Sequence, residues 1–167
     1  MYSLYRMDRR LLSCVYMAAR FVVPTVSVAK VRDSLPSYLE AARRHLLQIV
    51  TRHERDAVAF LALEDLQELL GSNHFETAVA LHEGEATVAL PQFSIIGIGE
   101  DLDTALDDAA GKLREYALQY QQRFEFYKHT DRRKLYPLVM RFLATPEDQQ
   151  RDLLLEPEET EAVTVLA

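Results

Sequence analysis

The chain has 167 residues, of which 49% are apolar, with one Cys and no Trp. This length suits one medium domain or two small ones, and the apolar fraction is ample for packed cores. A single Cys excludes an internal disulfide framework, and no apolar run approaches the roughly 20 residues that span a bilayer. We therefore expect a cytoplasmic protein with no membrane partner.

The net charge of −7 is unevenly distributed. Residues 1–56 carry ten Lys or Arg and five Asp or Glu, whereas residues 57–167 carry nine and twenty-one. A basic front part fits an anionic partner, and an acidic rear part fits a basic protein partner. Solvated helices that serve only solubility explain the acidic part equally well.

Residues 1–23 are expected to be a poorly defined N-terminal extension. The stretch 11–19 is apolar, but Arg20 ends it and no clear cleavage pattern follows. Because a second Met stands at position 17, residues 1–16 are interpreted as a loosely ordered extension or the product of an upstream start codon.

Residues 24–71 predict the order strand, helix, helix, strand, strand, helix. Val26 and Val28 alternate with polar residues in a half-buried strand pattern. Pro36 interrupts the helical run that follows, and suits the first turn of a new helix. The remaining elements are two short strands and a closing helix that ends at a glycine: Leu46–Val50, Ala57–Leu61 and Leu63–Leu70.

This order resembles the Phd/YefM antitoxins, and three segments carry the likeness: Ser27–Leu35, Ile49–Arg52 and Asp56–Leu66. Two features depart from the family pattern, since the hairpin has Glu54-Arg55 where a Gly is usual, and Leu66 replaces a common aromatic. The match covers under a third of the chain. It implies an α+β domain, β-α-α-β-β-α, that dimerises and binds DNA.

Four basic residues of this domain are the candidate DNA contacts. By resemblance, Arg32 and Arg52 occupy the positions that touch operator DNA in the family. Lys30 and Arg55 are added from charge and position. Lys30 and Arg32 lie in the first turns of a helix, whose N–H groups and dipole favour phosphate. The alternative is that all four are solvated surface charges.

Residues 72–126 predict a second unit of three strands and a helix. The strands are expected at Phe75–Leu81, Ala86–Leu90 and Ser94–Gly99. Asp101 is a suitable N-cap for a helix that runs to about Phe126.

This second unit resembles the HicB-like antitoxin domain, a partial ribonuclease H-like β-β-β-α fold, over Glu83–Phe93 and Gly99–Ala109. Gln92-Phe93 replaces the usual Asp-Leu, the Glu before Ala105 is missing, and so is the Cys of a common Pro-Gly-Cys segment. The resemblance implies a unit that binds rather than cleaves.

Residues 127–167 form a helical and acidic tail in this interpretation. Helices are expected over Asp131–Leu143, where Pro137 is awkward unless it marks a helix start, and after Thr145-Pro146-Glu147. Residues 162–167 are β-prone and either add a strand to a partner or fray. The candidate toxin contacts, which as an apolar stripe fit an internal core equally well, are Leu135, Val139, Phe142, Leu153, Leu154 and Leu155.

The sequence contains no catalytic constellation, no phosphate-binding loop and no metal-ligand spacing among its His and Cys residues, so no enzyme activity and no cofactor are expected. Four acids resemble a ribonuclease H-like metal cluster, but acids near a helix N-terminus ordinarily complement its dipole. They are Asp101, Asp103, Asp107 and Asp108.

Together these features predict a type II antitoxin. It would form a homodimer, repress its own operon through operator DNA, and block a cognate toxin, a basic protein such as a ribonuclease. Two alternatives remain open: a DNA-binding regulator without a toxin, whose second unit senses a ligand or oligomerises, and a ribonuclease H-like nuclease.

Overall fold

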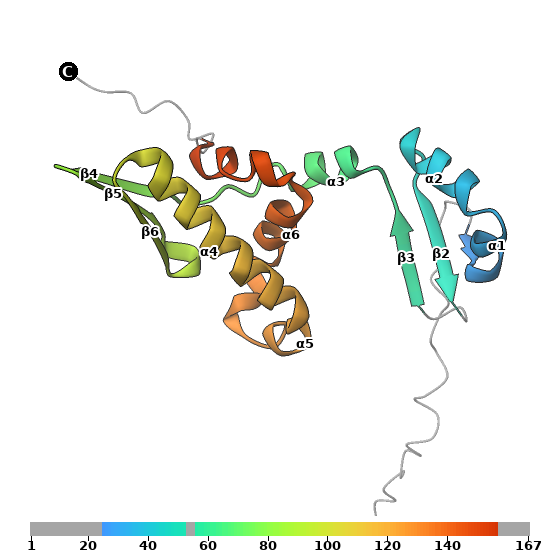
Figure 1. Cartoon of the computed structure of the whole chain (residues 1–167). Coiled ribbons are helices and arrows are strands. Elements are labelled where there is room, and N and C mark those ends of the chain that lie inside the picture. The colour runs from blue at the N-terminus through green and yellow to red at the C-terminus, as the bar shows by residue number, and fades with distance from the viewer. Residues whose placement is uncertain (1–24, 53–55, 157–167) are drawn as a thin grey trace, which may run out of the picture. The chain divides into compact units, whose positions relative to one another are not determined.

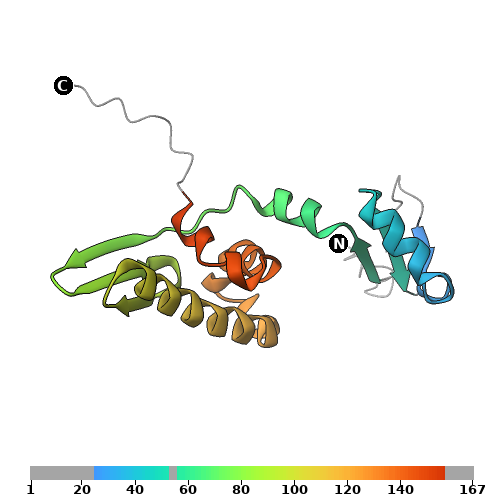
Figure 2. The ribbon, with the colours of Figure 1, turned by 45° about the horizontal axis from the view of Figure 1, so that its top comes forward.

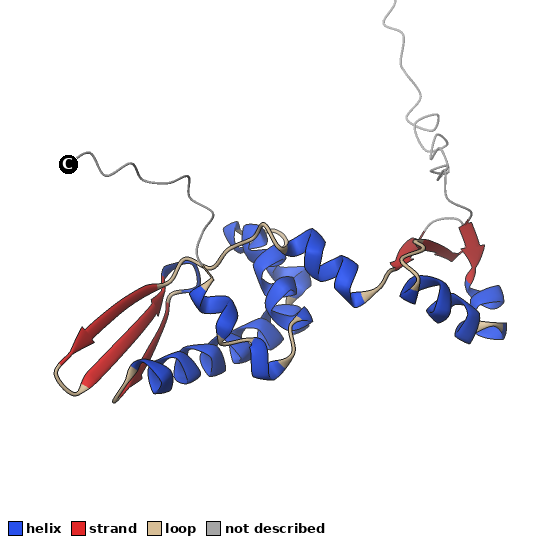
Figure 3. Cartoon of the chain, turned by 90° about the horizontal axis from the view of Figure 1, so that it is seen from above, coloured by secondary structure: helices blue, strands red, loops and turns tan. Residues whose placement is uncertain are grey.

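The structure, a computed structural model, describes residues 25–52 and 56–156. The chain forms two compact units, residues 1–62 (unit 1) and 63–167 (unit 2). Each contains a small sheet and helices, which confirms the α+β class (Figure 3). Within the described ranges, no helix combines the length and apolar character needed to cross a bilayer. The predicted extension, residues 1–23, lies outside them.

Unit 1 is a three-stranded sheet with two helices inserted between its first two strands (Figure 1). The strand order is β1-β2-β3, with β1 parallel to β2 and β2 antiparallel to β3. Its elements are β1 (Thr25–Ser27), α1 (Val28–Asp33), α2 (Leu35–Arg43), β2 (Gln48–Arg52) and β3 (Asp56–Phe60).

Local side-chain chemistry sets the boundaries of these elements. Ser27 ends β1 because its hydroxyl accepts a hydrogen bond from the backbone N–H of Lys30 at 3.4 Å, so Val28 begins a helix instead of ending a strand. Pro36 lies in the first turn of α2, as predicted. The second strand begins later than predicted, since His45, with φ 60°, closes α2 in a left-handed conformation.

Unit 2 is an antiparallel meander, β4-β5-β6, with the long helix α4 packed across β5 and β6 (Figure 2). Its helices and strands are α3 (Leu63–Leu70), β4 (Ala78–His82), β5 (Glu85–Leu90), β6 (Ile95–Gly99), α4 (Leu102–Gln122), α5 (Phe124–Tyr127) and α6 (Tyr136–Ala144). Short 3₁₀ helices complete it: η1 (Pro91–Phe93), η2 (Asp131–Leu135), η3 (Glu147–Gln149) and η4 (Asp152–Leu155).

Asp101 caps α4, as predicted. Its carboxylate accepts a hydrogen bond from the backbone N–H of Thr104 at 2.8 Å, and the Thr104 hydroxyl accepts one from the N–H of Asp101 at 3.1 Å. This reciprocal capping box fixes the helix start. The helix ends at Gln122 rather than near Phe126, and a short separate helix, α5, follows.

The helix α3 forms where predicted, and Gly71 follows its end, but the helix packs on α6. The side-chain amide of Gln67 donates a hydrogen bond to the carbonyl of Ala144 at 2.8 Å. The structure thus groups α3 with unit 2, whereas the sequence placed it in a first domain of residues 24–71. The sequence of an amphipathic helix indicates its apolar stripe but not which neighbour covers that stripe.

The tail differs from its prediction in two ways. A 3₁₀ turn, η2, precedes α6, and Pro137 lies in the first turn of α6, so it marks a helix start. The Thr145-Pro146-Glu147 signature begins only the 3₁₀ turn η3. The Thr145 hydroxyl donates back to the carbonyl of Arg141 at 2.9 Å and so caps no helix.

The core of unit 2 lies between the sheet, α4 and the tail. Phe75 was expected in a strand, but it precedes β4 in the sequence and lies in this core. Its ring centre is 6.0 Å from that of Phe93 and 6.2 Å from that of Phe142. Buried core residues from the three parts include Val88, Leu90, Leu106, Leu113, Tyr120, Leu135, Val139, Phe142 and Leu154.

Candidate functional site

Three of the four predicted DNA contacts, Lys30, Arg32 and Arg52, lie at the carboxyl ends of β1 and β2. This end of the sheet is called the basic edge of unit 1. β1 and β2 are parallel, with Ser27 beside Thr51, so β1 ends next to Arg52. Helix α1 starts at this same end, and it carries Lys30 and Arg32. Arg55 lies outside the described residues.

These three side chains are exposed. The side chain of Arg32 is 80% exposed, and its guanidinium lies 3.5 Å from the carboxylate of its neighbour Asp33. In the strand register Arg52 lies opposite Asp56 across the hairpin. An exposed ion pair such as that of Arg32 contributes little to stability, about 0–1 kcal/mol, so a phosphate can replace the Asp33 carboxylate at small cost. The arrangement therefore suits an anionic ligand.

The structure places five of the six predicted toxin contacts inside the core of unit 2. Leu135 lies in η2, Val139 and Phe142 in α6, and Leu153 and Leu154 in η4; each is at most 7% exposed. Only Leu155 reaches the surface, at 49% exposure. A direct contact between the five buried side chains and a toxin would require this core to open.

The four acids considered as a metal cluster each have protein partners. Asp101 caps α4, and Asp103 and Asp107 lie 3.6 and 3.7 Å from the guanidinium of Arg151. The carboxylate of Asp108 pairs with Lys112. The described residues contain no group of three or more His, Cys, Asp or Glu side chains that could hold a metal ion.

Hydrogen bonds lower the pKa of two of these acids below the ordinary aspartate value. The ammonium of Lys112, 2.7 Å away, and the backbone N–H of Ile98, 2.9 Å away, lower the pKa of Asp108. The backbone N–H and the hydroxyl of Thr104 lower the pKa of Asp101. These carboxylates thus serve to join α4 to β6 and to cap α4.

A basic and aromatic end of unit 2 was missed from the sequence. The guanidinium of Arg133 lies 4.9 Å from the ring centre of Tyr136 and 5.7 Å from that of Phe124. That of Arg123 lies 5.2 Å from the exposed ring of Phe126. The signal was present as five Lys or Arg among aromatic residues over 123–136. Cation–π contacts of this kind stabilise a surface whether or not a ligand binds.

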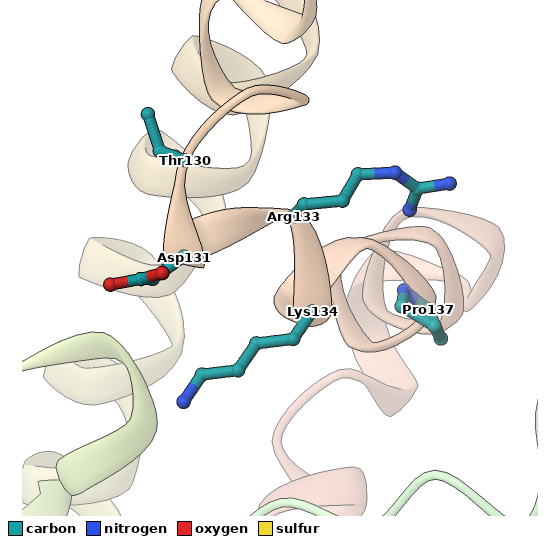
Figure 4. A pocket seen from close by; sticks show the side chains of 5 residues that line it. All are labelled: Thr130, Asp131, Arg133, Lys134 and Pro137. Carbon is teal, nitrogen blue, oxygen red and sulfur yellow. The ribbon is translucent and has the colours of Figure 1, made fainter.

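A hollow of about 600 Å³ lies beside this end, and Figure 4 shows its lining. The side chains of Arg133 and Lys134 point away from one another, and that of Asp131 takes a third direction. Because these charges do not converge on one point, the hollow lacks the arrangement that fixes a small ligand.

Comparisons with known proteins identify the class of protein. A family model named PHD-like, described as the antitoxin of a RelE/RelB toxin–antitoxin system, matches residues 22–156. A solved structure from Syntrophomonas wolfei subsp. wolfei, described as the antitoxin part of a proposed toxin/antitoxin system, is similar with a TM-score of 0.65. Its sequence identity is 20%, and the alignment covers 78% of this chain and 96% of that chain. No curated protein sequence matches.

At 20% identity the solved structure supports the fold alone. The family model is stronger evidence, because its match covers most of the chain and residues from both compact units. Antitoxins of this family are non-enzymatic regulatory proteins with a cognate toxin as partner, which confirms that the chain is not an enzyme. The chain belongs to the PHD-like family of RelE/RelB-type antitoxins.

Proposed function

We propose that this antitoxin neutralises its cognate toxin by direct binding and represses its own operon by binding operator DNA as a homodimer. The Phd/YefM-like part, residues 24–71, dimerises and binds DNA in the cytoplasm, and most of it lies in unit 1. The HicB-like part, residues 72–126, and the tail, residues 127–167, lie in unit 2 and bind the toxin. The observation that carries the proposal is the charge contrast between the two parts: net +5 over residues 1–56 and net −12 over residues 57–167.

The DNA part of the proposal is supported by the basic edge of unit 1. Lys30, Arg32 and Arg52 are exposed and leave the sheet where β1 ends beside β2. DNA binding depends on cations that neutralise phosphates, and dimerisation doubles the number that each protein offers. A symmetric dimer also matches the two half-sites of an operator.

The dimer is supported by the small core of unit 1. Among the residues of unit 1 that the structure describes, five apolar ones are buried: Val31, Ala42, Ile49, Val50 and Ala62. Six larger ones are at least 42% exposed: Val28, Leu35, Leu39, Leu46, Leu47 and Val58. So little buried area supports a unit of this size poorly, and a second copy would remove the exposed aliphatic side chains from water.

Val58→Lys is expected to convert the dimer to a monomer and to weaken operator binding. Val58 is 57% exposed on the edge strand β3, and a lysine ammonium would be buried without a partner in an apolar interface. Light scattering after size-exclusion chromatography measures the mass. Ser37→Lys, an exposed polar position on α2, is the matched control. A monomeric wild-type chain, or a dimer that survives Val58→Lys, would refute this interface.

The toxin part is supported by the family and by the acidic charge of unit 2. A toxin that cleaves RNA must itself attract phosphate, so a basic surface is expected on it. An acidic antitoxin surface complements that charge and speeds association. We therefore propose that the toxin is a basic protein, such as a ribonuclease.

Co-expression with the product of the adjacent gene tests the function as a whole. We expect the neighbour alone to stop growth, and this chain to restore growth and co-purify with it. A harmless neighbour that does not bind would leave a DNA-binding regulator, with the role of unit 2 reopened. Rescue without co-purification would contradict neutralisation by direct binding.

A further inference from the structure

Helix α4 packs on one face of β5 and β6 and leaves the opposite face of the sheet uncovered. Two glycines of β6 identify the covered face, because a Cβ on Gly97 would lie 2.3 Å from the carbonyl oxygen of Ala105 in α4. A Cβ on Gly99 would lie 2.2 Å from the hydroxyl of Thr104. Successive residues of a strand point to opposite faces. Ile96 and Ile98 therefore point away from the helix.

The uncovered face is mainly apolar, with Thr87 as the one polar residue of its two central rows. The strand register aligns Ala80, Thr87 and Ile98 in one row and Ala78, Ala89 and Ile96 in the next. Ile96 is 53% exposed and Ile98 is 54% exposed. In the described part of unit 2, no element lies over this face (Figure 1).

Acidic side chains border the apolar rows. The next row of the same face holds His82 paired with Glu85, and Glu100 follows Gly99 at the matching end of β6. Glu83 lies in the turn between β4 and β5. Residues 63–111 contain eleven Asp or Glu and no Lys or Arg, so no basic side chain of β4, β5 or β6 offsets this rim.

The edge of β6 is already occupied. The carboxylate of Asp108 accepts a hydrogen bond from the backbone N–H of Ile98 at 2.9 Å, and the ammonium of Lys112 donates one to the carbonyl of Ile96 at 2.8 Å. These side chains satisfy the backbone groups that another strand would need. A partner therefore meets the face of the sheet at this side, not its edge.

We propose that this outer sheet face, centred on Ile96 and Ile98 and rimmed by Glu83, Glu85 and Glu100, is the surface on which the basic toxin docks. The proposal rests on the proposed function. An apolar centre within a charged rim is the usual organisation of a protein interface. A second copy of this chain fits the face poorly, because two such faces would bring the same carboxylates together.

The size of the face explains why the rim is required. Three strands of about five residues present roughly 240 Å², at about 3.4 Å per residue and about 4.8 Å between strands. A standard interface buries about 800 Å² on each partner. The apolar rows therefore supply the centre of the contact, and the acidic rim supplies its margin and its charge complementarity.

Ile98→Lys in the full chain tests the proposal, with the adjacent gene product as the probe in a surface plasmon resonance measurement. We expect binding to weaken by at least about tenfold, because a lysine would place a cation at the centre of a contact with a basic protein. Leu118→Lys is the matched control, since Leu118 is 47% exposed on α4, outside the sheet. Its affinity should stay within about twofold of wild type.

The rim is tested by charge removal. Combined Glu85→Gln and Glu100→Gln should slow association and flatten its salt dependence, since exposed rim charges act mainly on the encounter rate. Glu115→Gln, an exposed acid of α4, should change neither. Unchanged operator binding and an unchanged thermal melt show that every variant is folded.

The outcomes separate this proposal from the function on which it rests. If the wild-type chain does not bind the adjacent gene product, the proposed toxin neutralisation fails and this surface fails with it. If the wild type binds and Ile98→Lys binds equally well, only the docking surface is refuted. A lower mass of the free Ile98→Lys chain would show instead that the face joins two copies, which also refutes it.

Discussion

Phe142→Ala should lower the free energy of unfolding of unit 2 by about 3–5 kcal/mol, the cost of removing a buried aromatic ring and leaving a cavity. Phe142 is fully buried on α6, and its ring packs edge-on against that of Phe75. Near-ultraviolet circular dichroism during urea unfolding measures the change. The chain has no Trp, and stacked Tyr120 and Tyr127 in unit 2 supply the signal.

Leu155→Ala is the control for this experiment, because the sequence grouped both residues as toxin contacts. Leu155 is 49% exposed, so its truncation should change stability by less than about 0.5 kcal/mol. Toxin affinity should then be measured at a temperature where both variants are folded. A Phe142→Ala variant that is as stable as wild type but no longer binds the toxin would contradict the core role of Phe142. It would support a direct contact between Phe142 and the toxin.

Arg32→Ala and Arg52→Ala are each expected to weaken operator binding by about 1–3 kcal/mol if the guanidinium reads a base. If it neutralises a phosphate instead, each should reduce the slope of log K against log salt by about one. Fluorescence anisotropy with the DNA upstream of the operon, at several salt concentrations, distinguishes the two. Both side chains are exposed, so neither substitution should alter the fold.

Arg43→Ala provides the matched control for the DNA experiment. Arg43 is an exposed arginine of α2 whose guanidinium lies 3.9 Å from the carboxylate of Glu40, and it is not part of the basic edge. Its loss should leave the affinity within about twofold of wild type. Wild-type binding by both Arg32→Ala and Arg52→Ala would remove the DNA assignment from that edge.

Helix and strand positions followed largely from local chemistry. Asp101 and Gly71 mark the ends of α4 and α3 because caps and glycines act within one turn of the backbone. The hydroxyl of Ser27 shows the limit of this approach. The alternating pattern predicts a strand at Val28. A helix begins there instead, because the Ser27 hydroxyl accepts a hydrogen bond from the backbone N–H of Lys30. Such boundary errors arise when a cap and an alternating pattern compete for one residue.

The sequence alone determined the α+β class, the basic front and acidic rear of the chain, and the apolar stripes of its helices. Only the tertiary structure decided what covers each stripe: α3 packs on α6, and Val139 and Phe142 enter a core instead of facing a partner. It also decided that Ile96 and Ile98 stay uncovered. Periodicity records which residues share a face, whereas burial depends on segments distant in sequence that pack against that face.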